Sequence, residues 1–236
     1  MSRIPIDKEH YDSSAYFEGK HASHLTDLNS SFQRYRIAKV TGIRPPNLED
    51  RVVDLGCGWG TFCFALAGQV SEVVGIDFSR KSIGLCEEIL SRTGQKNVRF
   101  VQADAGDTRL PADTFDLVIA ADLFEHLYPE DSKRVAAEAF RILAPAGHFV
   151  TWTPHRGHIL EIMKNNNFIL KNDVTHVDYK SMTQMKALLA GAGFKIEKAY
   201  YAESHLPGLQ ILERSLQSFL PLLRRRIAVL GRKLSG

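Results

Sequence analysis

The sequence predicts an α/β fold in which a doubly wound, mostly parallel sheet is covered by helices on both faces. Two observations support this prediction. Residues 52–60, VVDLGCGWG, indicate a buried strand followed by a turn with glycine at every second position, and residues 61–67 then indicate a helix. Apolar strands alternate with helical stretches from there to residue 153. Alternation of this kind implies right-handed crossovers between parallel strands.

The remaining elements follow the same rhythm. A helical pattern over residues 13–42 precedes the first strand, and residues 154–181 interrupt the rhythm as an insertion at the sheet edge. Ser79 can cap the second helix, and Gly94 can end it. Further helices are expected through Val135–Ile142, which a turn at 144–147 closes, and over 183–192. The later strands are expected at residues 72–77, 98–102, 115–121, 148–153, 194–201 and 226–232.

The composition limits the classes of protein to which the chain can belong. Of the 236 residues, 44% are hydrophobic, which is ordinary for a globular chain, and the net charge of +3 is too weak to indicate nucleic-acid binding. The three cysteines, an odd number without a Cys-x-x-Cys pair, favour a reduced cytoplasmic setting. No apolar signal segment begins the chain, and no apolar run reaches the roughly 18 residues of a membrane span.

The stretch after Pro207 carries apolar residues at helical spacing, followed by Arg224, Arg225 and Arg226. One interpretation is a basic amphipathic helix that lies on a membrane surface. The other is a helix whose apolar side faces the core before the last strand, and we favour it because apolar stripes usually do so. The apolar residues are Leu209, Leu212, Leu216, Phe219, Leu220 and Leu223.

The glycine turn indicates a nucleotide-like ligand. Its spacing is Gly-x-Gly-x-Gly, with Thr61 where a dinucleotide-binding turn would have its third glycine. Asp77 ends the second strand, 17 residues after Gly60, where an acid can accept both hydroxyls of a ribose. No lysine of a phosphate-binding loop is present. The ligand therefore carries a ribose and an adenine but need not carry phosphate.

Five stretches together resemble the class I S-adenosylmethionine-dependent methyltransferases, most closely the ubiquinone-type small-molecule O-methyltransferases. They are VVDLGCGWG, VVGIDFS, VQADAGDTRLPADTFDLVIAADLFEHL, RILAPAGHFVTWTP and GAGF, and they cover roughly residues 50–200 in the family's order. The resemblance implies a seven-stranded sheet whose last strand, IAVLGRK, is antiparallel. It also implies one domain with a helical cap (1–47), a cofactor-binding core (48–153), an acceptor cap (154–181) and C-terminal helices and strands (182–236).

The resemblance implies roles for individual residues around S-adenosylmethionine. Asp77 would hold the ribose, Phe78 would pack on the adenine, and Asp104 would bind the adenine amine. An arginine before the turn would contact the cofactor's carboxylate, and Arg34 and Arg36 both compete for that role. The full set of expected cofactor-binding residues is Arg36, Asp54, Gly56, Cys57, Gly58, Asp77, Phe78, Asp104, Ala105 and Asp122.

The stretch Asp122–His126 follows the fourth strand, where the family carries Glu-x-x-Glu-His and binds a divalent metal. Together with His176 of the insertion, the resemblance implies a metal set of Asp122, Glu125, His126 and His176 for Mg²⁺, Mn²⁺ or Zn²⁺. The alternative is a capping box between Asp122 and Glu125, with His126 acting as a base without metal. Glu125, His126 and His176 are candidate catalytic residues, and the loop residue His155 is a further one.

These features predict transfer of a methyl group from S-adenosylmethionine to a small molecule, most readily at a hydroxyl oxygen. No nucleic-acid acceptor is expected, because no basic stripe interleaved with aromatic residues is present. Two alternatives remain open. One is an NAD-type oxidoreductase on a related sheet, and the other is a cofactor-binding partner subunit without catalysis.

Overall fold

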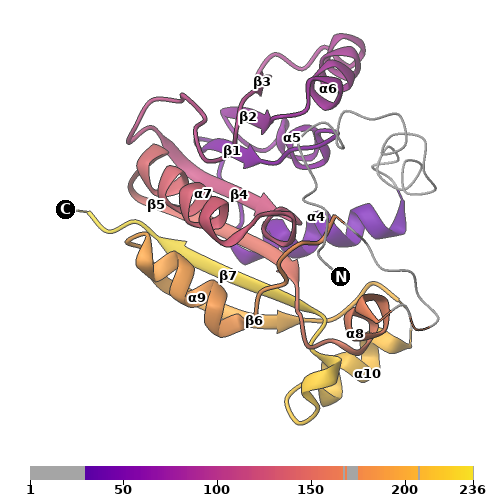
Figure 1. Ribbon diagram of the computed structural model, residues 1–236. Helices are drawn as coiled ribbons and strands as arrows, with labels where there is room; N and C mark the ends of the chain where they lie inside the picture. Colours follow the sequence, from indigo (N-terminus) through magenta and orange to yellow (C-terminus); the bar gives the residue numbers. More distant parts are fainter. Residues whose placement is uncertain (1–29, 167, 169–174, 207, 236) are drawn as a thin grey trace.

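A computed structural model describes residues 30–166, 168, 175–206 and 208–235. The first part of the expected helical cap, residues 1–29, lies outside the described residues. The expected seven-stranded sheet is confirmed, with the order β3-β2-β1-β4-β5-β7-β6 (Figure 1). The strands are β1 (Arg51–Leu55), β2 (Glu72–Asp77), β3 (Val98–Gln102), β4 (Phe115–Ala121), β5 (Leu143–Pro154), β6 (Lys195–Ala202) and β7 (Arg226–Arg232).

The pairing of the strands also follows the expectation. Strands β1 to β5 pair in parallel, whereas β7 is antiparallel to both β5 and β6. Strand β5 begins earlier than expected, because its irregular start includes the predicted turn at 144–147. Ala146 in that turn has a positive φ of 68°. The carboxyl ends of the parallel strands therefore meet at one edge, where ligands bind in open α/β sheets.

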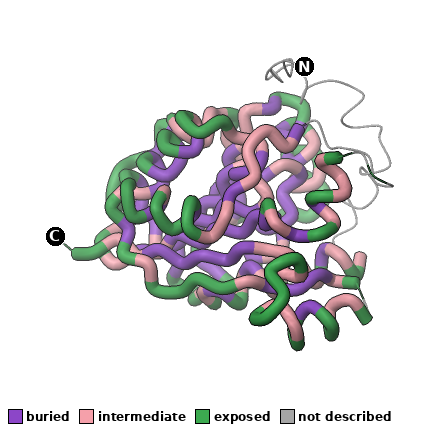
Figure 2. Tube along the Cα trace, turned by 60° about the horizontal axis from the view of Figure 1, so that its bottom comes forward, coloured by how far each residue is buried: buried purple, intermediate pink, exposed green. Residues whose placement is uncertain are grey.

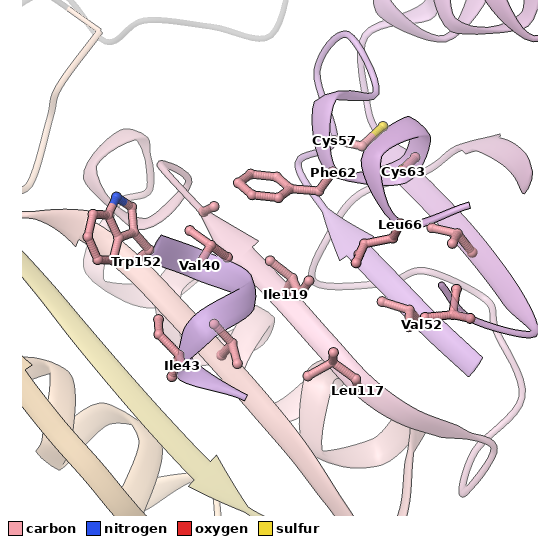
Figure 3. Packing of buried hydrophobic residues seen from close by; sticks show 14 of the residues in the cluster. Val40, Ile43, Val52, Cys57, Phe62, Cys63, Leu66, Leu117, Ile119 and Trp152 are labelled. Carbon is pink, nitrogen blue, oxygen red and sulfur yellow. The ribbon is translucent and has the colours of Figure 1, made fainter. Parts of the chain in front are cut away.

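Helices cover both faces of the sheet. On one face, α4 and α5 pack on residues such as Leu117, Ile119 and Trp152 (Figure 3). On the other, α7 and α9 pack on residues such as Val53 and Phe149. The helices are α4 (Ser31–Ile43), α5 (Thr61–Leu66), α6 (Arg80–Thr93), α7 (Pro129–Ile142), α8 (Ile159–Asn165), α9 (Met182–Gly191) and α10 (Leu209–Leu216), with short 3₁₀ turns η1 (Phe124–His126) and η2 (Pro221–Leu223).

The sequence itself explains why the sheet has two cores. Neighbouring residues of a strand point to opposite faces, so Val52 joins the cluster under α4 and α5, and Val53 joins the cluster under α7 and α9. The central strands β1, β2 and β4 are accordingly buried along most of their length (Figure 2). A sheet covered on both faces holds its carboxyl-end turns in fixed positions, which places the candidate site.

The expectation of a core-facing helix after Pro207 was wrong. Helix α10 ends at Leu216, and two residues of the predicted apolar stripe, Leu212 and Phe219, are 47% and 80% exposed. The buried residue of α10 is Glu213, whose Oε1 lies 3.1 Å from Nε2 of the buried His158. Because this polar pair points inward, most of the apolar stripe is left half-buried or exposed. Among the described residues, no helix is long and apolar enough to cross a membrane.

Candidate active site

The glycine turn lies at the carboxyl end of β1. Gly56, Gly58 and Gly60 all adopt positive φ, at 70°, 52° and 75°. Glycine takes this conformation without the strain that a side chain would cause. At Gly60 a Cβ atom would also lie 2.6 Å from the Phe64 ring. The turn therefore brings its backbone close to any ligand above it and passes directly into α5.

Asp77 is tied to this turn. Its Oδ2 accepts a hydrogen bond from the Gly58 N–H at 2.9 Å, and its Oδ1 accepts one from the Ser79 N–H at 2.9 Å. A carboxylate oxygen can accept more than one hydrogen bond, so Asp77 can hold the turn and also contact a ligand. Phe78, Asp104 and Ala105 are partly buried along the same edge, and the Gly106 N–H donates to Asp104 at 2.8 Å.

Asp54 lies beneath the turn and is almost completely buried. Burial raises the pKa of this carboxyl to about 7, against the opposing effect of the Arg36 guanidinium. The Cys63 thiol lies 3.7 Å from Asp54 Oδ2, and burial raises the pKa of that thiol to about 11. Cys57 in the turn is also buried, so both thiols remain protonated near neutral pH.

The two candidate arginines, Arg34 and Arg36, lie on different sides of helix α4. Arg36 is buried and Arg34 is exposed, so only Arg36 of this pair faces the site. The Arg36 guanidinium lies 5.1 Å from the centre of the Phe62 ring, just after the glycine turn. Its Nε lies 2.9 Å from Asp122 Oδ2. Arg36 therefore bridges the residues that follow β1 and those that follow β4.

Asp122 is held by two arginines, Arg36 and Arg226, which both form ion pairs with it. Burial acts to raise the pKa of Asp122, but Arg226 and Arg36 hold it below its ordinary value. The alternative of a capping box is not what the structure shows, because η1 begins after Leu123 without a side-chain cap. With both oxygens facing guanidinium groups, Asp122 also departs from the expected metal set.

Glu125, His126 and His176 come together beside Asp122. Each offers one ligand atom, and the three atoms all lie within 4.8 Å of one another. Glu125 is almost completely buried, and the Thr153 hydroxyl donates to its Oε2 at 2.9 Å. Burial, and then the neighbouring Asp122 charge, raise the pKa of Glu125 to about 8. The structure thus brings together three of the four expected metal ligands.

Hydrogen bonds fix the orientation of both imidazoles. His126 Nδ1 lies 3.1 Å from the Thr175 carbonyl oxygen, which can only accept, so Nδ1 carries the proton. His176 Nδ1 lies 2.6 Å from the Tyr179 hydroxyl, which in turn donates to Glu161 at 2.9 Å. In each ring Nε2 is left as the basic nitrogen, able to accept a proton or to bind a metal.

His155 does not join this group. Its Nδ1 lies 3.1 Å from the Arg224 carbonyl oxygen, and its ring packs edge-on against Tyr201. Sequence reasoning missed Arg226 and Thr153, which hold Asp122 and Glu125. Arg226 could have been noticed as a charge at the start of an otherwise apolar strand. No comparable signal marked Thr153, because it is one β-branched residue within a strand.

Comparisons with known proteins agree with this geometry. The family model described as a methyltransferase domain matches residues 47–206. An uncharacterized methyltransferase, YcgJ of Bacillus subtilis, is 26% identical over 145 residues, covering 60% of this chain and 56% of that protein. The ubiquinone biosynthesis O-methyltransferase of Aromatoleum aromaticum is 35% identical over 107 residues, covering 45% and 44%. The chain thus spans about half the length of these two relatives.

Among solved structures, a Haemonchus contortus phospholethanolamine N-methyltransferase 2 in complex with S-adenosylhomocysteine has the same fold. Its TM-score is 0.76 at 15% identity, over 100% of this chain and 62% of that one. The sheet order and the glycine turn are those of a Rossmann-like fold, and the family match places this fold among the class I S-adenosylmethionine-dependent methyltransferases. The chain belongs to the methyltransferase domain family.

Proposed function

We propose that the chain transfers a methyl group from S-adenosylmethionine to a hydroxyl oxygen of a small molecule. The observation that carries the choice of oxygen is the His126 imidazole. Its Nδ1–H is engaged by the Thr175 carbonyl, so its basic Nε2 can take the proton of an acceptor hydroxyl. This ring lies just after β4. In the sheet, β1 lies between β4 and β2, so the ring and Asp77 lie on opposite sides of β1.

The cofactor would lie across the ends of β1, β2 and β3. Asp77 would accept the ribose hydroxyls, Phe78 would pack on the adenine, and Asp104 would bind the adenine amine. Asp54 would lie beneath the methionine part of the cofactor, and Arg36 would face its carboxylate. Gly56, Cys57 and Gly58 would pass under it, Ala105 would line the adenine pocket, and Asp122 would close the site at the end of β4.

When bound, S-adenosylmethionine supplies a methyl group on a positively charged sulfur. An aligned nucleophile can take this methyl group in an in-line displacement, with the sulfur as the leaving group. The chain's task is to align the acceptor oxygen and to remove its proton. His126 Nε2 receives that proton while Nδ1–H stays on the Thr175 carbonyl. The Asp122 carboxylate, which its two arginines keep ionised, then faces a positively charged imidazole.

A divalent metal at the same place is a second candidate, favoured by the compact group of Glu125, His126 and His176. Both imidazoles direct Nδ1–H toward acceptors outside the group, as metal-bound histidines usually do. Two imidazoles and one carboxylate suit Zn²⁺ or Mn²⁺ better than Mg²⁺, which prefers oxygen ligands. The metal would lower the pKa of an acceptor hydroxyl, with the chain supplying these three ligands.

The test is methylation of a panel of phenols, sugars and polyketide acids by the full chain with S-adenosylmethionine, followed by mass spectrometry. Turnover that falls at least 100-fold in His126→Gln supports the proposed base. The control is His148→Gln within β5, in which turnover should not fall in this way. Metal analysis and EDTA treatment decide the second candidate, which fails if activity survives and no metal is found. Cofactor binding without turnover on any acceptor, an RNA fraction included, contradicts the proposed function.

A further inference from the structure

A cavity of about 40 Å³ lies beside the carboxyl end of β5. Its walls come from α4, from the end of β5, from the segment that follows β6 and from the residues around the start of β7. They include Tyr35, Arg36, Trp152, Ser204, Arg225 and Arg226. Trp152 pairs with Ala121 of β4 and with Ala228 of β7. The cavity therefore lies on the far side of β4 from the glycine turn that follows β1.

One buried polar group in the cavity wall, the indole Nε1 of Trp152, has no hydrogen-bond partner among the described residues. The Ser204 hydroxyl in the same wall is buried as well and lies beside the Glu213 carboxylate, and Trp152 and Ser204 are 1% and 4% exposed. Trp152 lies beside Val40 of α4 (Figure 3). A buried polar group without a partner costs free energy, so native proteins seldom retain one without a reason. Indole N–H groups can only donate, and a hydroxyl can also donate.

The charges around the cavity favour an anion. Arg36 and Arg226 share the single carboxylate of Asp122, so one positive charge is left over. Arg225 is paired with Glu161, whose other oxygen accepts from the Tyr179 hydroxyl. These three guanidinium groups therefore contribute an excess positive charge to the wall.

Two acidic residues close to the cavity are already compensated. Glu203, which lines it, contacts Lys39 and Arg214, each at 2.6 Å. Glu213 accepts hydrogen bonds from the Ser204 N–H and contacts His158. The acids therefore do not cancel the excess charge that Arg36 and Arg226 leave. Residues with hydrogen-bond donors and positive charge therefore line a cavity that would hold about three water-sized groups.

We infer that this cavity is a subsite for a carboxylate of the methyl acceptor, bound by the Trp152 and Ser204 donors in the field of Arg36 and Arg226. The inference rests on the proposed function, because that function makes the bound molecule a methyl acceptor. A carboxylate group has three heavy atoms and fits the volume, and a phosphate is the larger anion. Because the cavity lies beyond β4, the carboxylate of the cofactor itself would remain near the glycine turn. Arg36 reaches from Phe62, after that turn, to Asp122, after β4, so its guanidinium would lie between the two carboxylates.

The test is calorimetric binding to the full chain that has been saturated with S-adenosylhomocysteine. The probes are acetate, benzoate and 4-hydroxybenzoate, with methyl benzoate as the uncharged control and inorganic phosphate as the larger anion. We expect the carboxylates to bind at least tenfold more tightly than the ester or phosphate. Ser204→Ala and Trp152→Phe should each weaken carboxylate binding about tenfold, and the exposed Ser215→Ala should not change it.

Three results would overturn the inference. The first is equal binding of ester and carboxylate, and the second is carboxylate binding that neither variant weakens. The third is competition between carboxylates and S-adenosylhomocysteine, which would assign the cavity to the cofactor. Trp152→Phe keeps most of the buried ring and Ser204→Ala removes one oxygen, so a folding defect in one leaves the other to decide. Selective carboxylate binding without methylation of any acceptor would uphold the subsite and refute the proposed function.

Discussion

Replacing Asp77 by asparagine should lower the affinity for S-adenosylhomocysteine about 100-fold. Each hydrogen bond from a ribose hydroxyl to a carboxylate contributes roughly 1.5–3 kcal/mol, so two contribute roughly 3–6 kcal/mol. At about 1.4 kcal/mol for each tenfold change, that range corresponds to a loss of about 10²–10⁴. Asparagine keeps one neutral acceptor and should fall at the lower end, and Asp77→Ala at the upper end.

The fold should survive this change, which makes the measurement decisive. Asp77 also accepts from the Gly58 and Ser79 N–H groups, but this site is partly open, so their loss should cost about 1 kcal/mol each. Isothermal titration calorimetry gives the affinity, and circular dichroism checks folding. Asp113→Asn is the matched control, because Asp113 is exposed and its ion pair is with Lys233, far from the glycine turn. A loss below about fivefold in folded Asp77→Asn would refute the assigned role.

Three further predictions follow from burial and charge. Burial raises the pKa of Asp54 from its ordinary value of 3.8 to about 7, so between these pH values the folded chain keeps this proton and the unfolded chain loses it. The free energy of unfolding should therefore fall by up to about 4 kcal/mol from pH 4 to pH 7. Asp54→Asn should abolish that fall in urea titrations. His126→Gln should reduce turnover 10²–10⁴-fold without changing affinity for S-adenosylhomocysteine, and a parallel loss of both would contradict a base. Phe219→Ser should change the free energy of unfolding by less than about 0.5 kcal/mol, whereas Met185→Ala should cost about 2–5 kcal/mol.

Most of the fold was predictable because it depends on local patterns. Strands β1, β2 and β4 consist mostly of apolar residues, and the caps at Ser79 and Gly94 formed where the sequence placed them. The glycine turn was equally clear, since its three positive φ angles require residues without side chains. Helix α10 was misread because its apolar spacing gives no sign that Glu213 turns inward to meet His158, 55 positions earlier.

The candidate site was predictable as a list of residues but not as an arrangement. Asp122, Glu125 and His126 are near neighbours in sequence, yet Asp122 turns to Arg36 and Arg226, while Glu125 and His126 face His176. That division depends on contacts between residues that are 50 to 104 positions apart, which local spacing does not encode. The same applies to the cavity beside Trp152, whose walls come from both halves of the chain.

The central claim is that this chain uses S-adenosylmethionine to methylate a small-molecule oxygen. The most direct measurement is incubation with S-adenosylmethionine carrying an isotopically labelled methyl group and a panel of hydroxylated acids, followed by mass spectrometry. The account predicts one labelled methyl on an acceptor oxygen, with S-adenosylhomocysteine formed in equal amount and the product lost in His126→Gln. Tight binding of NAD instead of S-adenosylmethionine, with no labelled product from any acceptor, would contradict it.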